Sequence, residues 1–350
     1  MIEQIIHGQK YDIVVGNDLS ERIKGVISAP DTFLITDSNV EKLYGAEFAR
    51  ARYVLPAGED SKRLVNVGKI CDAMLASGCN RAATVIALGG GVVGDIAGFA
   101  ASVYMRGVKV IQIPTTLLAM CDSSIGGKTG VNANAKNIIG AFHQPSAVIT
   151  SMHFLKTLPR REMLCGMGEI FKTALLDARL YAVFKDLIRE LKTDGKGLII
   201  EPDGLTDIVR LCAAYKLDVV TKDEREAGLR KILNVGHTLG HALEVYDKYR
   251  LSHGEYVIQG IGLEAAIAKD IGLVDSGHFN ETQEYCRVLG SGETPRFDPE
   301  KLAHLCEFDK KNKSGGVSIM LSLAPGKTEE ILLKPEELVK TLKRIKTGHK

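Results

Sequence analysis

The pattern of hydrophobic and polar residues changes along the chain, and its first part is rich in short β-like runs. Helical stretches and glycine-rich turns separate these runs. The runs are Tyr11–Val15, Thr32–Thr36, Thr84–Leu88 and Val108–Ile113. Strands that alternate with helical segments are typical of βαβ units, so this part predicts an α/β fold with a largely parallel sheet.

The pattern changes near residue 155. Beyond it, long amphipathic stretches such as Leu205–Asp218 and Gly260–Ile271 dominate, and strand signals are few. Because proline often marks the join between domains, the expected boundary is the Leu158-Pro159 step. The sequence therefore predicts an α/β domain over residues 1–157 and a mostly α-helical domain over residues 158–350.

Composition is that of an ordinary globular protein. The chain has 350 residues, of which 45% are hydrophobic and 25% charged, so it is long enough for two domains with their own cores. The formal net charge is only +2, and no run of basic residues stands apart from compensating acids. This balance argues against nucleic-acid binding.

The cysteines and the N-terminus indicate a soluble, cytoplasmic protein. The seven cysteines are odd in number and scattered without CxxC pairs, which suits a reducing compartment and argues against a cysteine zinc site. The N-terminus lacks the basic and apolar regions of a signal peptide, and nowhere do 18 uncharged apolar residues run together. We therefore expect no membrane partner.

A buried strand leads into a glycine-rich turn in "TVIALGGGVVGDIAGFAA", residues 84–101. Gly89, Gly91 and Gly94 match the G-x-G-x-x-G dinucleotide fingerprint in the required strand-turn-helix context. The acidic residue usual about 20 positions later is missing, because that region reads "KVIQ". The motif therefore indicates a dinucleotide site that departs from the standard Rossmann pattern, with a turn that serves packing alone as the alternative.

The next segment, "IPTTLLAMCDSSIGGKTGVN" at residues 113–132, resembles a P-loop only superficially. The P-loop spacing needs a glycine at position 122, which is Asp122. ATP hydrolysis is therefore not expected.

Three histidines, His237, His241 and His253, fall within 17 residues. If residues 234–244 are helical, His237 and His241 lie one turn apart on one face. A lone histidine is more often a packed core residue, but three so close together favour a metal site. A catalytic site also needs an oxygen donor, and Glu169 in "CGMGEIFKTALL" offers one, with Lys172 three residues on. Spacing alone leaves open which two histidines bind.

Beyond these separate signals, the chain resembles the 3-dehydroquinate synthase family over nearly its whole length. The shared motifs run in order from "AGEDSK" at Ala57 through "GGGVVGD", "YMRGV", "IPTTLLAMCDSSIGGKTGVN", "AKNIIGAFHQP", "FLKTLP", "GEIFK", "DEREAGLRKILNVGHTLGHALE" and "LSHGE" to "DKKNK" at Asp309. The resemblance implies a Rossmann-like NAD-binding domain, a mostly α-helical metal-binding domain and a homodimer.

Carried over residue by residue, the resemblance implies roles for the metal and NAD sites. Zinc or cobalt would be held by Glu169, His237 and His253, and His241 would move protons instead. The residues implied to bind NAD are Asp37, Asn39, Glu59, Lys62, Gly90, Gly91, Val92, Asp95, Thr115, Thr116, Asp122, Lys128, Lys136, Phe154, Leu155, Lys156 and Thr157.

The implied substrate is a sugar-acid phosphate, 3-deoxy-D-arabino-heptulosonate 7-phosphate, whose carboxylate and phosphate call for fixed cations. The resemblance implies that it is oxidised transiently by NAD, loses phosphate by β-elimination, is reduced again and closes by an intramolecular aldol reaction. The implied catalytic residues are Arg106, Asp122, Lys128, Asn137, Lys172, Glu226 and His241. The implied substrate-binding residues are Lys216, Arg230, Asn234, and Lys310 or Lys311.

Other functions share some of these sequence features. Sugar-phosphate cyclases that make deoxy-inosose or valiolone tend to alter the segment after the first metal histidine, which here keeps Asn234 and His241. A polyol dehydrogenase of the glycerol dehydrogenase type typically uses an aspartate ligand and lacks the lysine set, so Glu169, Lys128 and Lys172 count against it. An aminodehydroquinate synthase stays open, and a non-catalytic NAD sensor would not need a metal site.

Overall fold

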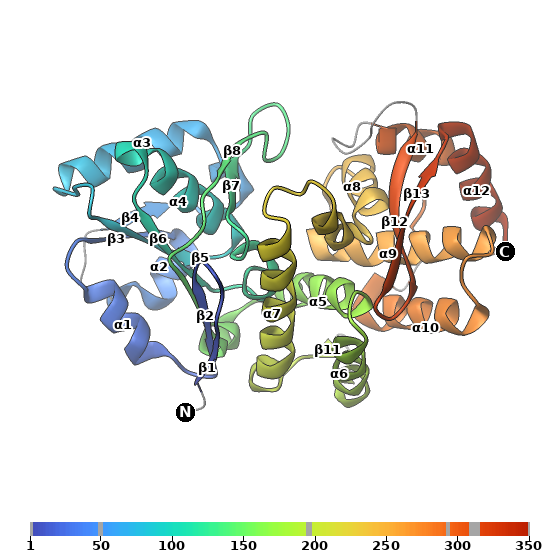
Figure 1. Cartoon of the computed structure of the whole chain (residues 1–350), viewed down its shortest axis with the longest axis horizontal. Coiled ribbons are helices and arrows are strands. Elements are labelled where there is room, and N and C mark those ends of the chain that lie inside the picture. Colours follow the sequence, from blue (N-terminus) through green and yellow to red (C-terminus); the bar gives the residue numbers. More distant parts are fainter. Residues whose placement is uncertain (1–2, 48–51, 194–197, 292–294, 308–315, 349–350) are drawn as a thin grey trace. The chain divides into compact units, whose positions relative to one another are not determined.

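The computed structural model of the chain describes residues 3–47, 52–193, 198–291, 295–307 and 316–348 (Figure 1). The chain forms two compact units. The first comprises Met1–Pro159 and Glu201–Arg225, and the second comprises Arg160–Ile200 and Glu226–Lys350.

The first unit is built on a seven-stranded sheet in the order β1-β2-β9-β6-β5-β3-β4 (Figure 1). All neighbouring strands are parallel except the β1 and β2 pair. The strands are β1 (Glu3–Ile6), β2 (Asp12–Gly16), β3 (Thr32–Asp37), β4 (Arg52–Leu55), β5 (Thr84–Gly89), β6 (Lys109–Pro114) and β9 (Ala147–Ser151). The four strands expected from the sequence are β2, β3, β5 and β6, so the α/β prediction is confirmed.

Helices and shorter elements complete this unit. The helices are α1 (Ser20–Ser28), α2 (Ser38–Tyr44), α3 (Leu64–Ala76), α4 (Gly91–Val103) and α7 (Thr206–Lys222). A hairpin of β7 (Lys128–Val131) and β8 (Ile139–Phe142) follows β6. The short helical turns are η1 (Gly45–Glu47), η2 (Glu59–Ser61), η3 (Tyr104–Arg106), η4 (Ala119–Ser123), η5 (Met152–Thr157) and η6 (Pro202–Leu205).

The central strands are buried on both faces, which explains their nearly continuous apolar runs. In β3, Phe33 and Ile35 point into a core with residues of α3 and α4, among them Ile70 and Ile96. Leu34, between them, is also buried and faces the other side of the sheet, because successive strand residues alternate in direction.

The position of α7 differs from the expected single boundary after residue 157. This helix contains residues 206–218 of the predicted amphipathic stretch and packs against β2 and η4 of the first unit. Its buried residues include Ile208, Val209 and Cys212. Amphipathicity shows that one face of a helix is covered, but it does not show which element covers that face. The sequence pattern therefore predicted this helix as part of the helical domain over residues 158–350.

The second unit is predominantly helical, as predicted. Its helices are α5 (Arg160–Leu175), α6 (Ala178–Glu190), α8 (His237–Tyr246), α9 (His253–Asp270), α10 (Ser276–Cys286), α11 (Pro299–Glu307) and α12 (Pro335–Gly348), with short turns η7 (Leu229–Asn234) and η8 (Arg287–Ser291). Two antiparallel pairs accompany them, β10 (Lys192–Thr193) with β11 (Leu198–Ile199), and β12 (Val317–Ala324) with β13 (Lys327–Leu333).

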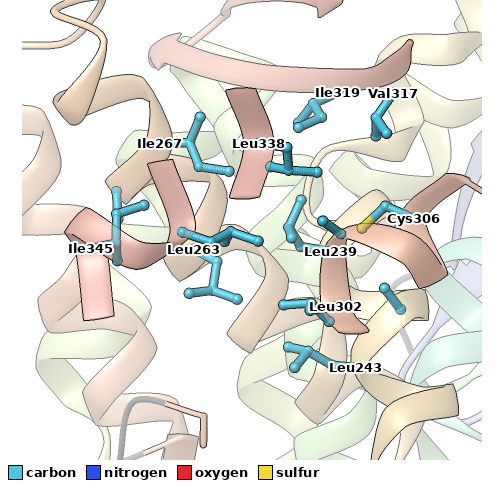
Figure 2. Packing of buried hydrophobic residues seen from close by; sticks show 14 of the residues in the cluster. Leu239, Leu243, Leu263, Ile267, Leu302, Cys306, Val317, Ile319, Leu338 and Ile345 are labelled. Carbon is cyan, nitrogen blue, oxygen red and sulfur yellow. The ribbon is translucent and has the colours of Figure 1, made fainter. Parts of the chain in front are cut away.

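The β12-β13 hairpin was not expected from the sequence. Val317, Ile319 and Leu321 alternate along β12 and are buried in the core of the second unit. Figure 2 shows this core, in which Val317 and Ile319 face leucines and isoleucines of α8, α9, α11 and α12. The hairpin thus covers α9, the helix that begins with His253.

Candidate NAD and metal sites

The glycine-rich turn connects β5 to α4 and leaves no room for side chains. A Cβ on Gly89 would lie 2.6 Å from Val93, and one on Gly90 would lie 2.9 Å from Thr116 Cγ2. A Cβ on Gly94 would lie 2.8 Å from the side chain of Gln112 on β6. These contacts match the glycine roles of a dinucleotide fingerprint, namely a tight turn and close helix-strand packing.

This turn lies where the chain order of the sheet reverses. From β3, the chain moves outward to β4 and then returns to the other side of β3 to form β5. Ligands of open α/β sheets bind outside the carboxyl ends of the strands at such a switch point. The structure places most of the expected NAD residues directly after carboxyl ends, following β3, β4, β5, β6 and β9.

Asp37 and Lys62 illustrate how these residues are fixed. The Asp37 carboxylate ends β3 and accepts hydrogen bonds from the backbone N–H of Asn39 and Val40, which caps α2. The buried Lys62 ammonium lies 2.5 Å from Asp95 Oδ2 on α4. Burial raises the pKa of the Asp95 carboxyl, although Lys62 opposes this shift.

Two further groups of expected residues also have defined partners. The segment Phe154–Thr157 packs against α2, where Tyr44 contacts the Phe154 ring edge-on and shares a 2.6 Å hydrogen bond with Thr157. The Lys216 ammonium of α7 forms an ion pair with Asp122 and donates to the Asp122 carbonyl oxygen at 2.5 Å. Lys128 opens β7 and is exposed, and Lys136 is exposed in the turn that follows β7.

In the second unit, close glycine contacts bring three helices together around Glu169, His237 and His253. A Cβ on Gly254 would lie 1.9 Å from the carbonyl oxygen of Cys165, so α5 and α9 pack backbone to backbone. A Cβ on Gly260 would lie equally close, 1.9 Å, to the carbonyl oxygen of Gly236 before α8. Gly254 directly follows His253, and Gly236 directly precedes His237, so this packing sets the dimensions of the site.

The Glu169 carboxylate lies at the centre of this cluster. Its Oε1 atom is 3.1 Å from His253 Nε2 and 3.6 Å from His237 Nε2, while its Oε2 atom is 2.6 Å from the Lys172 ammonium. Glu169 and Lys172 are each 1% exposed. One carboxylate oxygen thus faces two imidazole nitrogens, and the other is neutralised by a buried cation.

His237, His241 and His253 approach one another, with one nitrogen of each ring within 4.8 Å of the others. Two ligand sets therefore fit the geometry, three imidazoles or Glu169 with two of them. We favour Glu169 with His237 and His253, because Glu169 Oε1 lies close to the Nε2 atoms of both rings. One carboxylate and two imidazoles leave a position open at a catalytic zinc ion.

The far side of each of these two rings has an oxygen partner. His237 Nδ1 lies 3.1 Å from the carbonyl oxygen of Val235, and His253 Nδ1 lies 3.2 Å from Glu244 Oε1. Such partners fix the tautomer of a metal-binding histidine so that Nε2 faces the ion. The donor set and its outer partners therefore fit a divalent metal.

Charge in the cluster follows from these contacts. Burial would raise the pKa of the Glu169 carboxyl, but Lys172, His237 and His253 hold it well below its usual range. Burial lowers the pKa of His237 well below its ordinary value. For His253, burial is outweighed by hydrogen bonds to Glu169 and Glu244, which raise its pKa to about 10. The surroundings thus favour a positive charge between Glu169 and Glu244.

Sequence reasoning missed two carboxylates of this cluster, Glu244 and Glu264. Glu244 lies seven residues after His237, two helical turns along α8, and this spacing could have identified it. Glu264 of α9 is 2% exposed and accepts the backbone N–H of Gly236 at 2.5 Å, at the start of α8. No local pattern predicts Glu264, because its partner lies 28 residues away.

Most of the other residues expected to contact the substrate lie in turns or at the ends of elements. Glu226 accepts from Asn234 Nδ2 at 3.0 Å, and both lie before α8, which begins at His237 and not at residue 234 as expected. Arg230 is buried in η7. Arg106 and Asn137 both have a left-handed backbone, with φ of 69° and 53°. Lys310 and Lys311 lie outside the described residues.

Comparisons with known proteins cover most of the chain. The model of the 3-dehydroquinate synthase N-terminal domain matches residues 52–165, and that of the C-terminal domain matches residues 166–312. This chain belongs to the 3-dehydroquinate synthase family. The expectation from the sequence motifs is therefore confirmed.

Individual relatives agree with this assignment. The 3-dehydroquinate synthase of Alkaliphilus metalliredigens (strain QYMF) is 43% identical over 342 residues, which cover 94% of each chain. This chain is similar to enzymes of this name over nearly its full length, which shows that it is an enzyme with the same lyase activity.

Related cyclases share the fold. The structure of 2-epi-5-epi-valiolone synthase from Streptomyces hygroscopicus subsp. jinggangensis 5008, with NAD+ and Zn2+ bound, has a TM-score of 0.84 at 26% identity and covers 99% of both chains. A 2-deoxy-scyllo-inosose synthase complexed with carbaglucose-6-phosphate, NAD+ and Co2+ has a TM-score of 0.81 at 23% identity and covers 98% of this chain and 99% of its own. These likenesses support the predicted fold class, α/β followed by helical.

Two further expectations can be compared with the structure. All seven cysteines are free thiols. Cys165, which adjoins the cluster, is buried, and burial raises the pKa of its thiol to about 11, so it is a poor nucleophile. Within the described ranges, no helix is both long and apolar enough to cross a membrane.

Proposed function

We propose that this member of the 3-dehydroquinate synthase family uses NAD and a divalent metal to convert 3-deoxy-D-arabino-heptulosonate 7-phosphate to 3-dehydroquinate and phosphate. The observation that carries the proposal is the Glu169, His237 and His253 cluster, in a chain whose other unit has a glycine-rich turn between strand β5 and helix α4. A related cyclase with NAD+ and Zn2+ bound supports both groups.

The first unit would hold NAD. The backbone at Gly90 and Gly91 begins α4, so its N–H groups are available to the pyrophosphate. Asp37 and Glu59 would accept hydrogen bonds from ribose hydroxyls at the carboxyl ends of β3 and β4. The other cofactor residues expected from the sequence follow neighbouring strands, and their roles stay predictions.

The second unit would hold the metal through Glu169, His237 and His253, with Lys172 neutralising the second carboxylate oxygen. When bound, NAD supplies a reversible hydride acceptor, and the metal supplies a Lewis acid for the hydroxyl groups of the substrate. The hydride that NAD removes is later returned, so the reaction causes no net oxidation. The overall change is the loss of phosphate and the closure of a ring.

We propose that His241 and Glu226 transfer protons during the reaction. His241 lies one turn after His237, with ring centroids 5.1 Å apart, so it stands beside the ligands. Imidazole exchanges protons readily near neutral pH. Glu226 is held by Asn234, which limits the motion of its carboxylate.

The cationic residues would bind the carboxylate and phosphate of the substrate. The expected cations are Arg106, Lys128 and Arg230, and the neutral amide of Asn137 is expected to add hydrogen bonds. Lys172 is also expected to act on the substrate, in addition to the ion pair that its ammonium forms with Glu169. The part played by Lys310 or Lys311 stays a prediction.

We also infer that the protein acts in the cytoplasm as a homodimer and takes zinc or cobalt. Free cysteines are compatible with a reducing compartment. Imidazole and carboxylate ligands suit both metals. The dimer rests on family resemblance alone, and sedimentation analysis tests it.

The proposal is tested by phosphate release. The purified protein is given NAD, Zn2+ or Co2+, and the heptulosonate phosphate, and phosphate and NADH are followed together. We expect phosphate to accumulate without a matching rise in NADH. Steady NADH production from glycerol would indicate a polyol dehydrogenase, and a preference for another sugar phosphate in a substrate panel would indicate a different cyclase.

A further inference from the structure

The side chain and backbone of Asn132 connect two segments that the proposed function assigns to NAD and substrate. Asn132 follows β7 and is half-buried. Its Nδ2 atom donates to Glu59 Oε1 at 2.7 Å, and its Oδ1 atom accepts from the backbone N–H of Asn137 at 2.8 Å. Both ends of the amide are therefore used.

The backbone of Asn132 adds a third connection. Its N–H donates to the carbonyl oxygen of Lys62 at 2.7 Å, and Asn132 forms a parallel bridge with Arg63. The Lys62 side chain pairs in turn with Asp95 on α4, the helix that begins at the glycine-rich turn. A continuous set of contacts thus runs from α4 through Lys62 and Asn132 to Asn137.

The turn that carries Asn137 depends on this anchor. Residues 133–138 are exposed, so little packing fixes their backbone. Asn137 adopts a left-handed backbone with φ of 53°, which asparagine tolerates better than most residues but which still needs support. The hydrogen bond from Asn137 to Asn132 Oδ1 supplies that support.

We propose that Asn132 is a positioning residue that orients the Glu59 carboxylate toward NAD and holds Asn137 for the substrate. The inference rests on the proposed function, in which Glu59 and Asn137 make those contacts. It goes further by assigning a role to a residue that carries neither contact itself.

Two substitutions separate the two tasks. Asn132→Asp keeps an oxygen that accepts the Asn137 N–H but places a carboxylate against Glu59. Asn132→Ala removes both side-chain contacts. Neither change removes the backbone bond to Lys62, so effects can be assigned to the amide. Asn80→Ala, which removes the Asn80 hydrogen bond to Ala82 in an exposed turn, is the matched control.

The first measurement is the dissociation constant of NAD by calorimetry. We expect both Asn132 variants to raise it about tenfold, the effect of losing one hydrogen bond to a charged group. The second measurement is the KM of the heptulosonate phosphate at saturating NAD. We expect Asn132→Ala to raise this KM and Asn132→Asp to leave it nearly unchanged, since only the aspartate keeps the acceptor for Asn137.

A Glu59→Ala background tests whether Asn132 acts through Glu59. There Asn132→Asp should change the NAD dissociation constant by less than about twofold, since contacting residues are not additive. An undiminished effect in this background, or unchanged NAD binding in both single variants, overturns the inference. If the unsubstituted chain binds no NAD, the proposed function fails as well. Thermal unfolding identifies a variant that does not fold. If Asn132→Ala does not fold, the Asn132→Asp comparison with and without Glu59→Ala decides.

Discussion

Glu244 Oε1 lies 3.2 Å from His253 Nδ1, on the side of the ring opposite to Glu169. The Glu244 side chain is only 7% exposed. His253 is therefore held between two carboxylates, one that faces the candidate metal position and one that orients the ring. A carboxylate behind a metal-binding histidine fixes its tautomer and strengthens its basicity.

We expect Glu244→Gln to weaken metal binding by about 10- to 100-fold, because the amide can still accept a hydrogen bond but carries no charge. The measurement is Zn2+ affinity by competition with a chelator. Glu300→Gln removes a carboxylate from an exposed ion pair with Lys343 and serves as the control. Equal zinc affinity in the wild type and the Glu244 variant would contradict this role.

Metal content distinguishes the two ligand sets that the histidine cluster permits. His237→Ala and His253→Ala should each lose the metal, since each removes one of three ligands. His241→Ala should keep the metal and lower kcat, because its ring would serve proton transfer. Elemental analysis of the purified variants checks this. Loss of metal in His241→Ala with retention in His253→Ala would mean that His241, not His253, is the second imidazole ligand.

Gly254→Ala should disrupt the metal cluster without touching a ligand. The added Cβ would lie 1.9 Å from the Cys165 carbonyl oxygen, so α5 and α9 must separate, and Glu169 would move from His253. We expect a loss of zinc affinity and a destabilisation of about 1–3 kcal/mol, as for other overpacked sites. Chelator competition and denaturant unfolding measure the two effects.

The control for this prediction is Gly68→Ala. Gly68 lies in α3 and is exposed, and a Cβ there would meet no atom within 4 Å. Alanine is the better helix former, so this variant should gain about 0.5–1 kcal/mol. If both variants behave alike, close packing of α5 on α9 does not set the site.

The sequence predicted the strands β2, β3, β5 and β6 because fully buried parallel strands produce short, continuous apolar runs that are bounded by turn signals. It also identified Glu169 and the three histidines, because their spacing is local or their motifs are distinctive. It did not place α7 in the first unit or predict the β12-β13 hairpin. Both depend on which distant element covers an apolar face, and that information is not local.

The two carboxylates behind the cluster differ in this respect, because helical spacing from His237 could have identified Glu244, whereas no local pattern predicts Glu264. Glu244 and Glu264 act across the contact between α8 and α9, through His253 and the backbone N–H of Gly236. These contacts of Glu244 and Glu264 depend on the close packing of α8 on α9, which the glycines allow. A sequence pattern records the glycines but not the partner that each one approaches.

Glu281 joins α6 to α10 and gives the second unit a pH-dependent contact. Its carboxylate accepts from Tyr181 at 2.8 Å and from Tyr285 at 3.1 Å, and it pairs with Lys185 at 2.6 Å. Burial would raise the pKa of Glu281, but these partners together lower it below its ordinary value. A carboxyl whose pKa is lower in the folded state stabilises the fold above its unfolded pKa.

The stabilisation from Glu281 should therefore be complete at neutral pH and should decline as the pH falls below the ordinary glutamate pKa, as the folded carboxyl becomes protonated. Because the side chain is 34% exposed, solvent screening limits the effect, and we expect Glu281→Gln to cost only about 1 kcal/mol at pH 7. Denaturant unfolding at pH 7 and in mild acid measures it. The difference between wild type and variant should shrink in acid, and a difference that grows there would mean that the charged carboxylate is not what stabilises this contact.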